Sequence, residues 1–166
     1  MELLKFAIEW TKDEISSSKI FILFGILFMS ASIGFWQLGK TEIAKAFIYP
    51  ILIAGILLLM TGFGFYFSNK SRLSNIESNY SGNPSAFVES EIVKTEKIMN
   101  SYENIAFKIF PAIIAIAALL IISTDKAIWR AICITVIAFL TVLLVLDINA
   151  NARIKNYHKE LKQIKK

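Results

Sequence analysis

The sequence predicts an all-α, polytopic membrane protein with four transmembrane helices in two antiparallel hairpins and with cytoplasmic helical extensions. Three observations support this prediction: four long apolar runs, short connections within each pair of runs, and basic residues concentrated on one side of the resulting topology. The 166 residues are 55% hydrophobic, above the roughly 45–50% of ordinary soluble domains. This length favours a single membrane domain over residues 1–166.

The apolar runs have the length that a bilayer requires. Ile20–Gly39 and Ala46–Asn69 contain 20 and 24 residues without Asp, Glu, Lys or Arg, and about 20 helical residues cross a hydrocarbon core of roughly 30 Å. Ile109–Thr124 and Ala131–Leu146 contain 16 residues each, and cations that snorkel at their boundaries extend them. We therefore expect transmembrane helices over 20–39, 46–69, 106–124 and 127–146.

A soluble bundle of buried helices is the alternative reading of these runs. Helices in such bundles normally keep one polar stripe. The stretch Ile51–Met60 has no polar side chain on any face, and neither has Ala112–Ile122. The hydropathy pattern therefore favours a lipid environment.

The distribution of Lys and Arg predicts the orientation. The segments before the first run, between the second and third, and after the fourth carry 14 of these residues, and the two short turns carry 4. The positive-inside bias then places both termini and the middle segment in the cytoplasm, and we expect a bacterial inner membrane. The charges follow the membrane boundaries, which favours anionic lipid head groups as partners of the inner face over nucleic acid.

Residues 1–18 are predicted to form an amphipathic interfacial helix. Leu4, Ile8 and Ile15 recur at helical spacing, and Trp10 is expected among the head groups. Packing of this helix on a cytoplasmic bundle is an equally good interpretation. No cleavable signal peptide is expected, because the chain opens with a mixed-charge helical pattern.

Aromatic residues near the ends of the apolar runs are expected to anchor the protein at the two membrane interfaces. Trp36, Tyr49 and Trp129 fall at the outer boundary, and Tyr66 falls at the inner one. The full set of predicted anchors is Trp10, Trp36, Tyr49, Tyr66 and Trp129.

The aqueous segments are also predicted to be helical. Residues 70–108 should form a cytoplasmic helical hairpin that breaks at Ser81–Pro84, with Asn83 as the cap of an unbroken second helix that leads into the third span. Residues 147–166 should form a basic cytoplasmic helix. Apolar residues at three- and four-residue spacing give a face that packs either within the chain or on a partner; they are Ile98, Tyr102, Ile105, Ile154, Tyr157 and Leu161.

Two short motifs resemble ligand sites without the chemistry that those sites need. Gly34–Thr41 matches the phosphate-loop pattern, but bulky residues fill its interior at the end of a membrane helix. Asp147–Asn151 resembles the start of a calcium loop, yet Ala152 and His158 stand where that loop needs Gly and Glu. We therefore expect no cofactor and no metal, and we expect His158 to be solvated.

The apolar runs also lack catalytic groups. They contain no His, no pair of Asp at one depth and no embedded carboxylate or Lys, so acid–base and proton-coupled chemistry is disfavoured. No catalytic residue is assigned, and the chain is not expected to be an enzyme. The single cysteine, Cys133, is expected to be a small packing residue.

Small residues within the runs are predicted to let helices approach closely. They pack either within this bundle or between subunits, and they are Ser30, Gly34, Gly64, Ser68, Ala112, Ala115 and Ala118.

Two functions follow from these features. The first is a non-catalytic integral membrane interaction protein, such as an accessory subunit or an immunity-type protein that binds a membrane-acting partner. The alternative is a small channel or transporter formed by several copies, because four spans alone enclose little room. Its only available polar lining is Ser30, Gln37, Thr61, Thr135 and Thr141. Lipids, together with a protein partner or further copies of the chain, are thus the expected partners.

Overall fold

The computed structural model describes residues 2–164, and every element in that range is helical. Met1, Lys165 and Lys166, which the expected terminal helices include, lie outside the described residues. The elements are α1 (Glu2–Leu38), α2 (Glu42–Ala46), α3 (Ile48–Gly82), α4 (Pro84–Ser101), the π-helix η1 (Tyr102–Ile109), α5 (Phe110–Ser123) and α6 (Ala127–Ile164). The all-α prediction is confirmed for this range.

Four helical segments are long and apolar enough to cross a membrane, as the sequence predicts. They are Leu3–Leu38, Glu42–Gly82, Pro84–Ser123 and Ala127–Gln163, with 36, 41, 40 and 37 residues. At 1.5 Å per residue such helices are about 55–60 Å long, roughly twice the hydrocarbon thickness of a bilayer. About half of each segment therefore extends beyond the length needed to cross.

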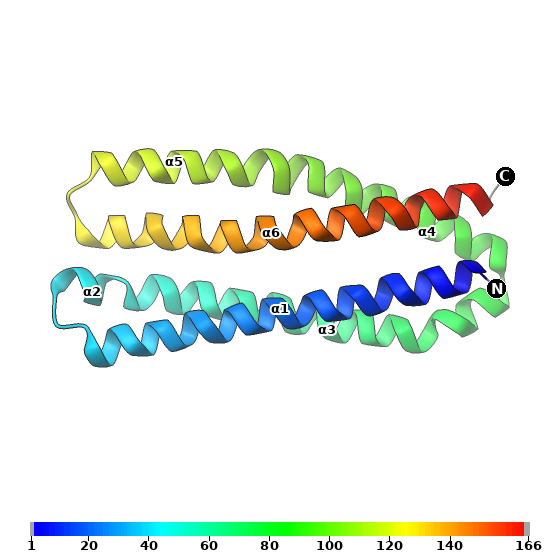
Figure 1. The fold of residues 1–166 in the computed structure, drawn as a ribbon, viewed down its shortest axis with the longest axis horizontal. Helices are drawn as coiled ribbons and strands as arrows, with labels where there is room; N and C mark the ends of the chain where they lie inside the picture. The colour runs from blue at the N-terminus through cyan, green and yellow to red at the C-terminus, as the bar shows by residue number, and fades with distance from the viewer. Residues whose placement is uncertain (1, 165–166) are drawn as a thin grey trace.

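The long helices lie alongside one another in pairs (Figure 1). Helix α1 packs along α3, and α5 packs along α6. Helix α2 and the connection Thr124–Lys126 lie at one end of the molecule, which we call the α2 end. Helix α4 and both ends of the chain lie at the other, which we call the terminal end.

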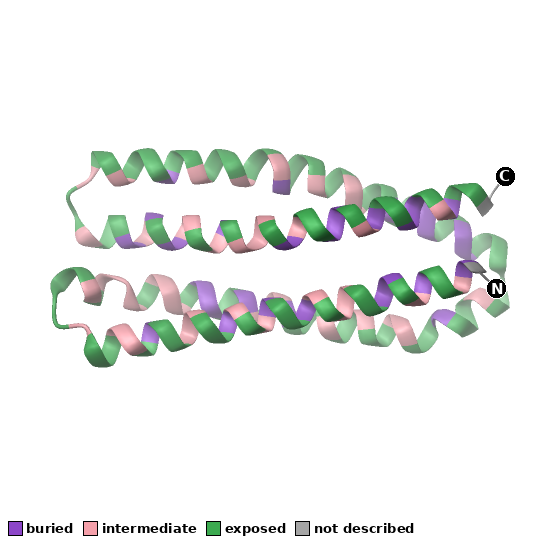
Figure 2. Cartoon of the chain, in the orientation of Figure 1, coloured by how far each residue is buried: buried purple, intermediate pink, exposed green. Residues whose placement is uncertain are grey.

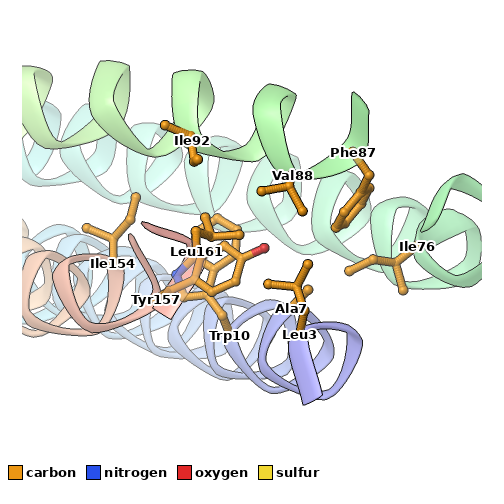
Figure 3. Close-up of a cluster of buried hydrophobic side chains, with 10 residues drawn as sticks. All are labelled: Leu3, Ala7, Trp10, Ile76, Phe87, Val88, Ile92, Ile154, Tyr157 and Leu161. Carbon is orange, nitrogen blue, oxygen red and sulfur yellow. The ribbon is translucent and has the colours of Figure 1, made fainter. Parts of the chain in front are cut away.

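Buried residues are concentrated at the terminal end (Figure 2). One cluster there joins α1, α3, α4 and α6, and we call this part the terminal bundle; its buried core is Leu3, Ala7, Trp10, Ile76, Phe87, Val88, Ile92, Ile154, Tyr157 and Leu161 (Figure 3). The second cluster contains only Phe21, Leu58 and Leu146 as buried members. This difference is consistent with apolar helices that cross a membrane, because apolar burial drives packing in water but not between helices in lipid.

Helix α1 runs from Glu2 to Leu38 without a break. Residues 2–18 therefore do not form the separate interfacial helix that was one of the two expectations. Leu3, Ala7 and Trp10 are buried in the terminal bundle, which agrees with the other expectation, a helix packed on its neighbours.

The break between α3 and α4 occurs where the sequence predicts it. Asn83 has an extended backbone, and its Oδ1 accepts a hydrogen bond from the backbone N–H of Ala86 at 3.1 Å. Pro84 occupies the first turn, where its missing N–H removes no helical bond. The chain therefore reverses at Asn83 and places α4 against the other helices of the terminal bundle.

The stretch between α4 and α5 continues the helix without a break, as expected, but it is not α-helical throughout. Residues Tyr102–Ile109 form a π-helix, and the Phe110 N–H bonds to the Ile105 carbonyl, five residues back. Pro111 follows directly. A proline has no N–H and its ring collides with the carbonyl four residues earlier, so the wider helix accommodates it.

Candidate functional site

A polar cluster of the terminal bundle is built around Arg72 of α3. Its Nη1 donates a hydrogen bond to the Thr11 hydroxyl at 2.8 Å, and its Nη2 forms an ion pair with Glu91 Oε2. The guanidinium carbon lies 4.3 Å from the centre of the Trp10 ring, within the range of a cation–π interaction. Arg72 thus connects α1, α3 and α4 through charge and hydrogen bonding.

Glu91 completes this cluster from α4. Its side chain is buried, and its Oε2 also accepts a hydrogen bond from the Tyr157 hydroxyl at 2.9 Å. The Tyr157 ring stacks on Trp10 with the ring centres 5.0 Å apart. Burial, followed by the Glu91 charge, raises the pKa of Tyr157 far above its usual range, so this hydroxyl remains a donor to the carboxylate. We call Thr11, Arg72, Glu91 and Tyr157 the Arg72 cluster.

The Arg72 cluster is suited to joining helices. One carboxylate oxygen of Glu91 accepts from two donors on two other helices, and Lys94 Nζ lies 3.9 Å from the second oxygen. Burial and the neighbouring Arg72 lower the pKa of Lys94. Within residues 2–164, no three His, Cys, Asp or Glu side chains gather as a metal site.

A second ion pair joins α1 and α6, the first and last helices of the chain. Arg153 of α6 donates to Glu14 Oε1 at 3.0 Å and to the Ser17 hydroxyl at 2.7 Å, and both acceptors belong to α1. Both charged side chains are partly buried. This contact fixes α6 against α1 at the position where the terminal bundle meets the more apolar half of the molecule.

His158 is buried, so the expectation that it is solvated is wrong. Only 8% of the residue is exposed, and Nδ1 lies 2.7 Å from the Thr95 hydroxyl. That hydroxyl also lies 2.9 Å from the Ile92 carbonyl, so Thr95 joins His158 of α6 to the backbone of α4. Its Nε2 lies 3.7 Å from Glu96, which also pairs with Lys162.

The terminal bundle should lose stability in mild acid because of His158. Burial and the nearby Lys162 lower the His158 pKa, against a smaller opposing effect of Glu96. The folded state then binds this proton more weakly than the unfolded state. The contribution is complete above about pH 6.5, the usual pKa of a histidine, and is lost as the pH falls from there through the lower pKa of the folded state. Thermal unfolding in detergent, followed by circular dichroism between pH 8 and 5, measures this loss.

The His158→Gln variant is the control for this pH response, because other groups also titrate in acid. Its unfolding temperature should fall less than that of the wild type over the same pH range. Equal falls would show that the proton on His158 does not affect folding.

The residues predicted to form a cytoplasmic partner face mostly pack within the chain. Ile154, Tyr157 and Leu161 are 1%, 4% and 0% exposed. Ile98 and Tyr102 pack against the same cluster. Only Ile105 is exposed, so the structure follows the intrachain alternative for the other five residues.

The predicted interfacial aromatics differ in their exposure. Trp36, Tyr49 and Trp129 are 70%, 70% and 54% exposed, and all three lie near the α2 end. Tyr66 is half-buried, with Lys70 Nζ 5.9 Å from its ring centre. Trp10 differs from the expectation, since it is 7% exposed and lies between Tyr157 and Arg72.

The seven small residues predicted at helix contacts lie outside the buried core of the chain. Six are exposed and Gly34 is half-buried. A Cβ atom built on Gly34 or Gly64 would meet no other atom within 4 Å. The buried alanine of α5 is Ala117, which the predicted alanine ridge does not include.

Three other glycines make the close contacts between α1 and α3. A Cβ on Gly25 would lie 2.7 Å from Leu59 Cγ, and one on Gly62 would lie 2.8 Å from Ile22 Cγ1. A Cβ on Gly55 would lie 2.9 Å from Met29 Cγ. Sequence reasoning missed these residues, although the seven-residue spacing of Gly55 and Gly62 places both on one helix face.

The five polar residues considered as a pore lining differ in their exposure within the chain. Ser30, Gln37 and Thr141 are exposed, Thr61 is half-buried and Thr135 is buried. Thr141 donates to the Ile137 carbonyl of its own helix at 2.7 Å. Cys133, predicted to be a packing residue, is buried and free.

Comparison with known proteins gives no match: no protein family, no curated protein and no solved structure resembles this chain significantly.

Proposed function

We propose that this chain is a non-catalytic integral membrane protein that binds a protein partner, or a further copy of itself, through small residues on the outer surface of its apolar helices. The observation that carries the proposal is that all seven predicted packing residues lie outside the core of the chain, while Gly25, Gly55 and Gly62 make the internal contacts. Small residues favour helix association in lipid because they allow backbones to approach closely.

The proposed placement puts the α2 end outside and the terminal bundle in the cytoplasm of a bacterial inner membrane. The excess of basic residues toward the terminal end supports this orientation. The paired helices are then two transmembrane hairpins, and the terminal bundle is their cytoplasmic extension. Exposed Trp36, Tyr49 and Trp129 lie where the outer head groups would be.

An accessory subunit or an immunity-type protein that holds a membrane-acting partner fits this arrangement best. Both need contact within the bilayer. The polar groups of the Arg72 cluster already pair with one another, which favours a binding role over a catalytic one. The channel alternative requires several copies around one axis, and the mass of the particle in native lipid distinguishes it from a complex with a different protein.

Replacing Gly64 by Leu should weaken the proposed association without weakening the fold. The site has open space in the chain, so the new side chain meets only what lies outside. We expect crosslinking in native membranes to recover a stoichiometric complex for the wild type and at least about tenfold less for the variant, with a particle mass in lipid nanodiscs that falls to that of one chain.

Phe63→Leu is the matched control, because Phe63 is an exposed neighbour on the same helix and the change keeps an apolar side chain. The control should retain the complex. A wild-type particle that contains one chain alone in native lipid would contradict the proposal.

A further inference from the structure

An apolar groove lies between α3, α5 and α6 near the α2 end. It has a volume of about 510 Å³, and its walls include Ile53 and Leu57 of α3, Ile113 of α5, and Ile132 and Phe139 of α6. Within the described chain, α5 packs on α6 and η1 but does not reach α3. The groove is therefore the space that this missing helix contact leaves open.

We propose that this groove binds one acyl chain of an anionic phospholipid, with the phosphate at the α2 end. The inference goes beyond partner binding and rests only on the helices lying in a membrane. Along α6 the lining extends from Ile128 to Leu140, about 18 Å at 1.5 Å per residue. That length is close to half of the roughly 30 Å hydrocarbon core, which is the depth of one leaflet.

The volume favours an acyl chain over a helix. A methylene group occupies about as much space as a water molecule, roughly 30 Å³ in the liquid, so the groove holds about 17 such groups. A helix that is 10–12 Å across and about 18 Å long needs on the order of 1,500 Å³. A whole helix therefore does not fit inside the groove, whereas one lipid chain does.

Two lysines near the α2 end, where the groove begins, are complementary to a phosphate. Tyr49 lines the groove at the start of α3, and α2, which carries Lys45, contacts α6. Lys126 directly precedes α6. Both lysines are exposed, and neither forms an ion pair among residues 2–164. Arg130 pairs with Asp125 beside them, so the lysine charges remain available to an anionic head group.

Native mass spectrometry of the full chain purified in mild detergent tests this proposal. We expect one phospholipid per chain, and the delipidated protein should rebind dioleoyl phosphatidylglycerol. Ile113→Trp fills the groove and should lower the bound fraction at least tenfold. Leu119→Trp is the matched control on the same helix, exposed and outside the groove, and should bind as the wild type does.

A second variant keeps the test decisive if Ile113→Trp fails to fold. Lys45→Gln combined with Lys126→Gln leaves the apolar walls intact and should reduce binding of phosphatidylglycerol severalfold while leaving binding of phosphatidylcholine unchanged. Lipid retention by folded Ile113→Trp equal to that of the wild type would overturn the proposal. So would a wild-type protein without bound lipid, or a groove occupant whose mass is that of a protein. The Gly64→Leu variant should keep its lipid. The lipid proposal and the partner proposal can therefore fail independently of each other.

Discussion

Replacing Glu91 by Leu is expected to lower the free energy of unfolding by about 3–5 kcal/mol, the typical cost of removing one partner from a buried ion pair. The variant leaves the Arg72 guanidinium in the terminal bundle without its carboxylate, and it leaves the Tyr157 hydroxyl without its acceptor. Glu91 is 6% exposed, so water cannot replace these interactions. Unfolding by sodium dodecyl sulfate in mixed micelles, followed by circular dichroism, measures the loss.

The double variant Arg72→Met, Glu91→Leu tests the cause of this loss. Replacing both members of a buried ion pair by apolar residues is often close to neutral, so the double variant should recover most of the stability. Glu77→Leu is the control, because Glu77 is exposed on α3. A double variant as unstable as Glu91→Leu would show that the charge left unpaired is not the source of the effect.

Replacing Gly62 by Leu should lower the free energy of unfolding by about 3 kcal/mol, at the upper end of the usual cost of overpacking. A Cβ at this position would lie 3.0 Å from the Ile22 backbone nitrogen and 3.0 Å from Phe21 Cβ. Backbone atoms cannot move aside as a side chain can, so α1 and α3 must separate. The same detergent titration measures the change.

Gly64→Leu is the matched control two residues further along α3. Its site is open, and its free energy of unfolding should change by less than about 0.5 kcal/mol. Equal destabilisation by the two variants would mean that the close approach of α1 and α3 at Gly62 does not stabilise the protein.

The features set by local chemistry could be predicted from the sequence. Four charge-free runs predict the four membrane-competent helices, since a backbone in lipid must pair its own N–H and C=O groups. Asn83 and Pro84 predict the start of α4, because capping depends on neighbouring residues only. These features require no knowledge of which helices become neighbours.

The polar contacts of the terminal bundle depend on tertiary packing and could not be predicted from the sequence. Arg72 and Glu91 are 19 positions apart, and Thr95 and His158 are 63 apart, so no short motif connects either pair. Tryptophan is a residue type typical of interfacial anchors, yet packing against Tyr157 buries Trp10. The outward position of Gly64, in contrast to Gly62, likewise depends on which face of α3 meets α1.

The central claim is that the chain crosses the membrane four times with the terminal bundle inside the cell. Thiol labelling in intact cells tests this claim most directly. In a Cys133→Ala background, single cysteines at three exposed positions, Thr41, Gly82 and Asp125, report the two sides. A membrane-impermeant maleimide should label Thr41→Cys and Asp125→Cys in intact cells, and Gly82→Cys only after permeabilisation. Labelling of Gly82→Cys in intact cells, or protection of Thr41→Cys and Asp125→Cys until the cells are opened, would contradict it.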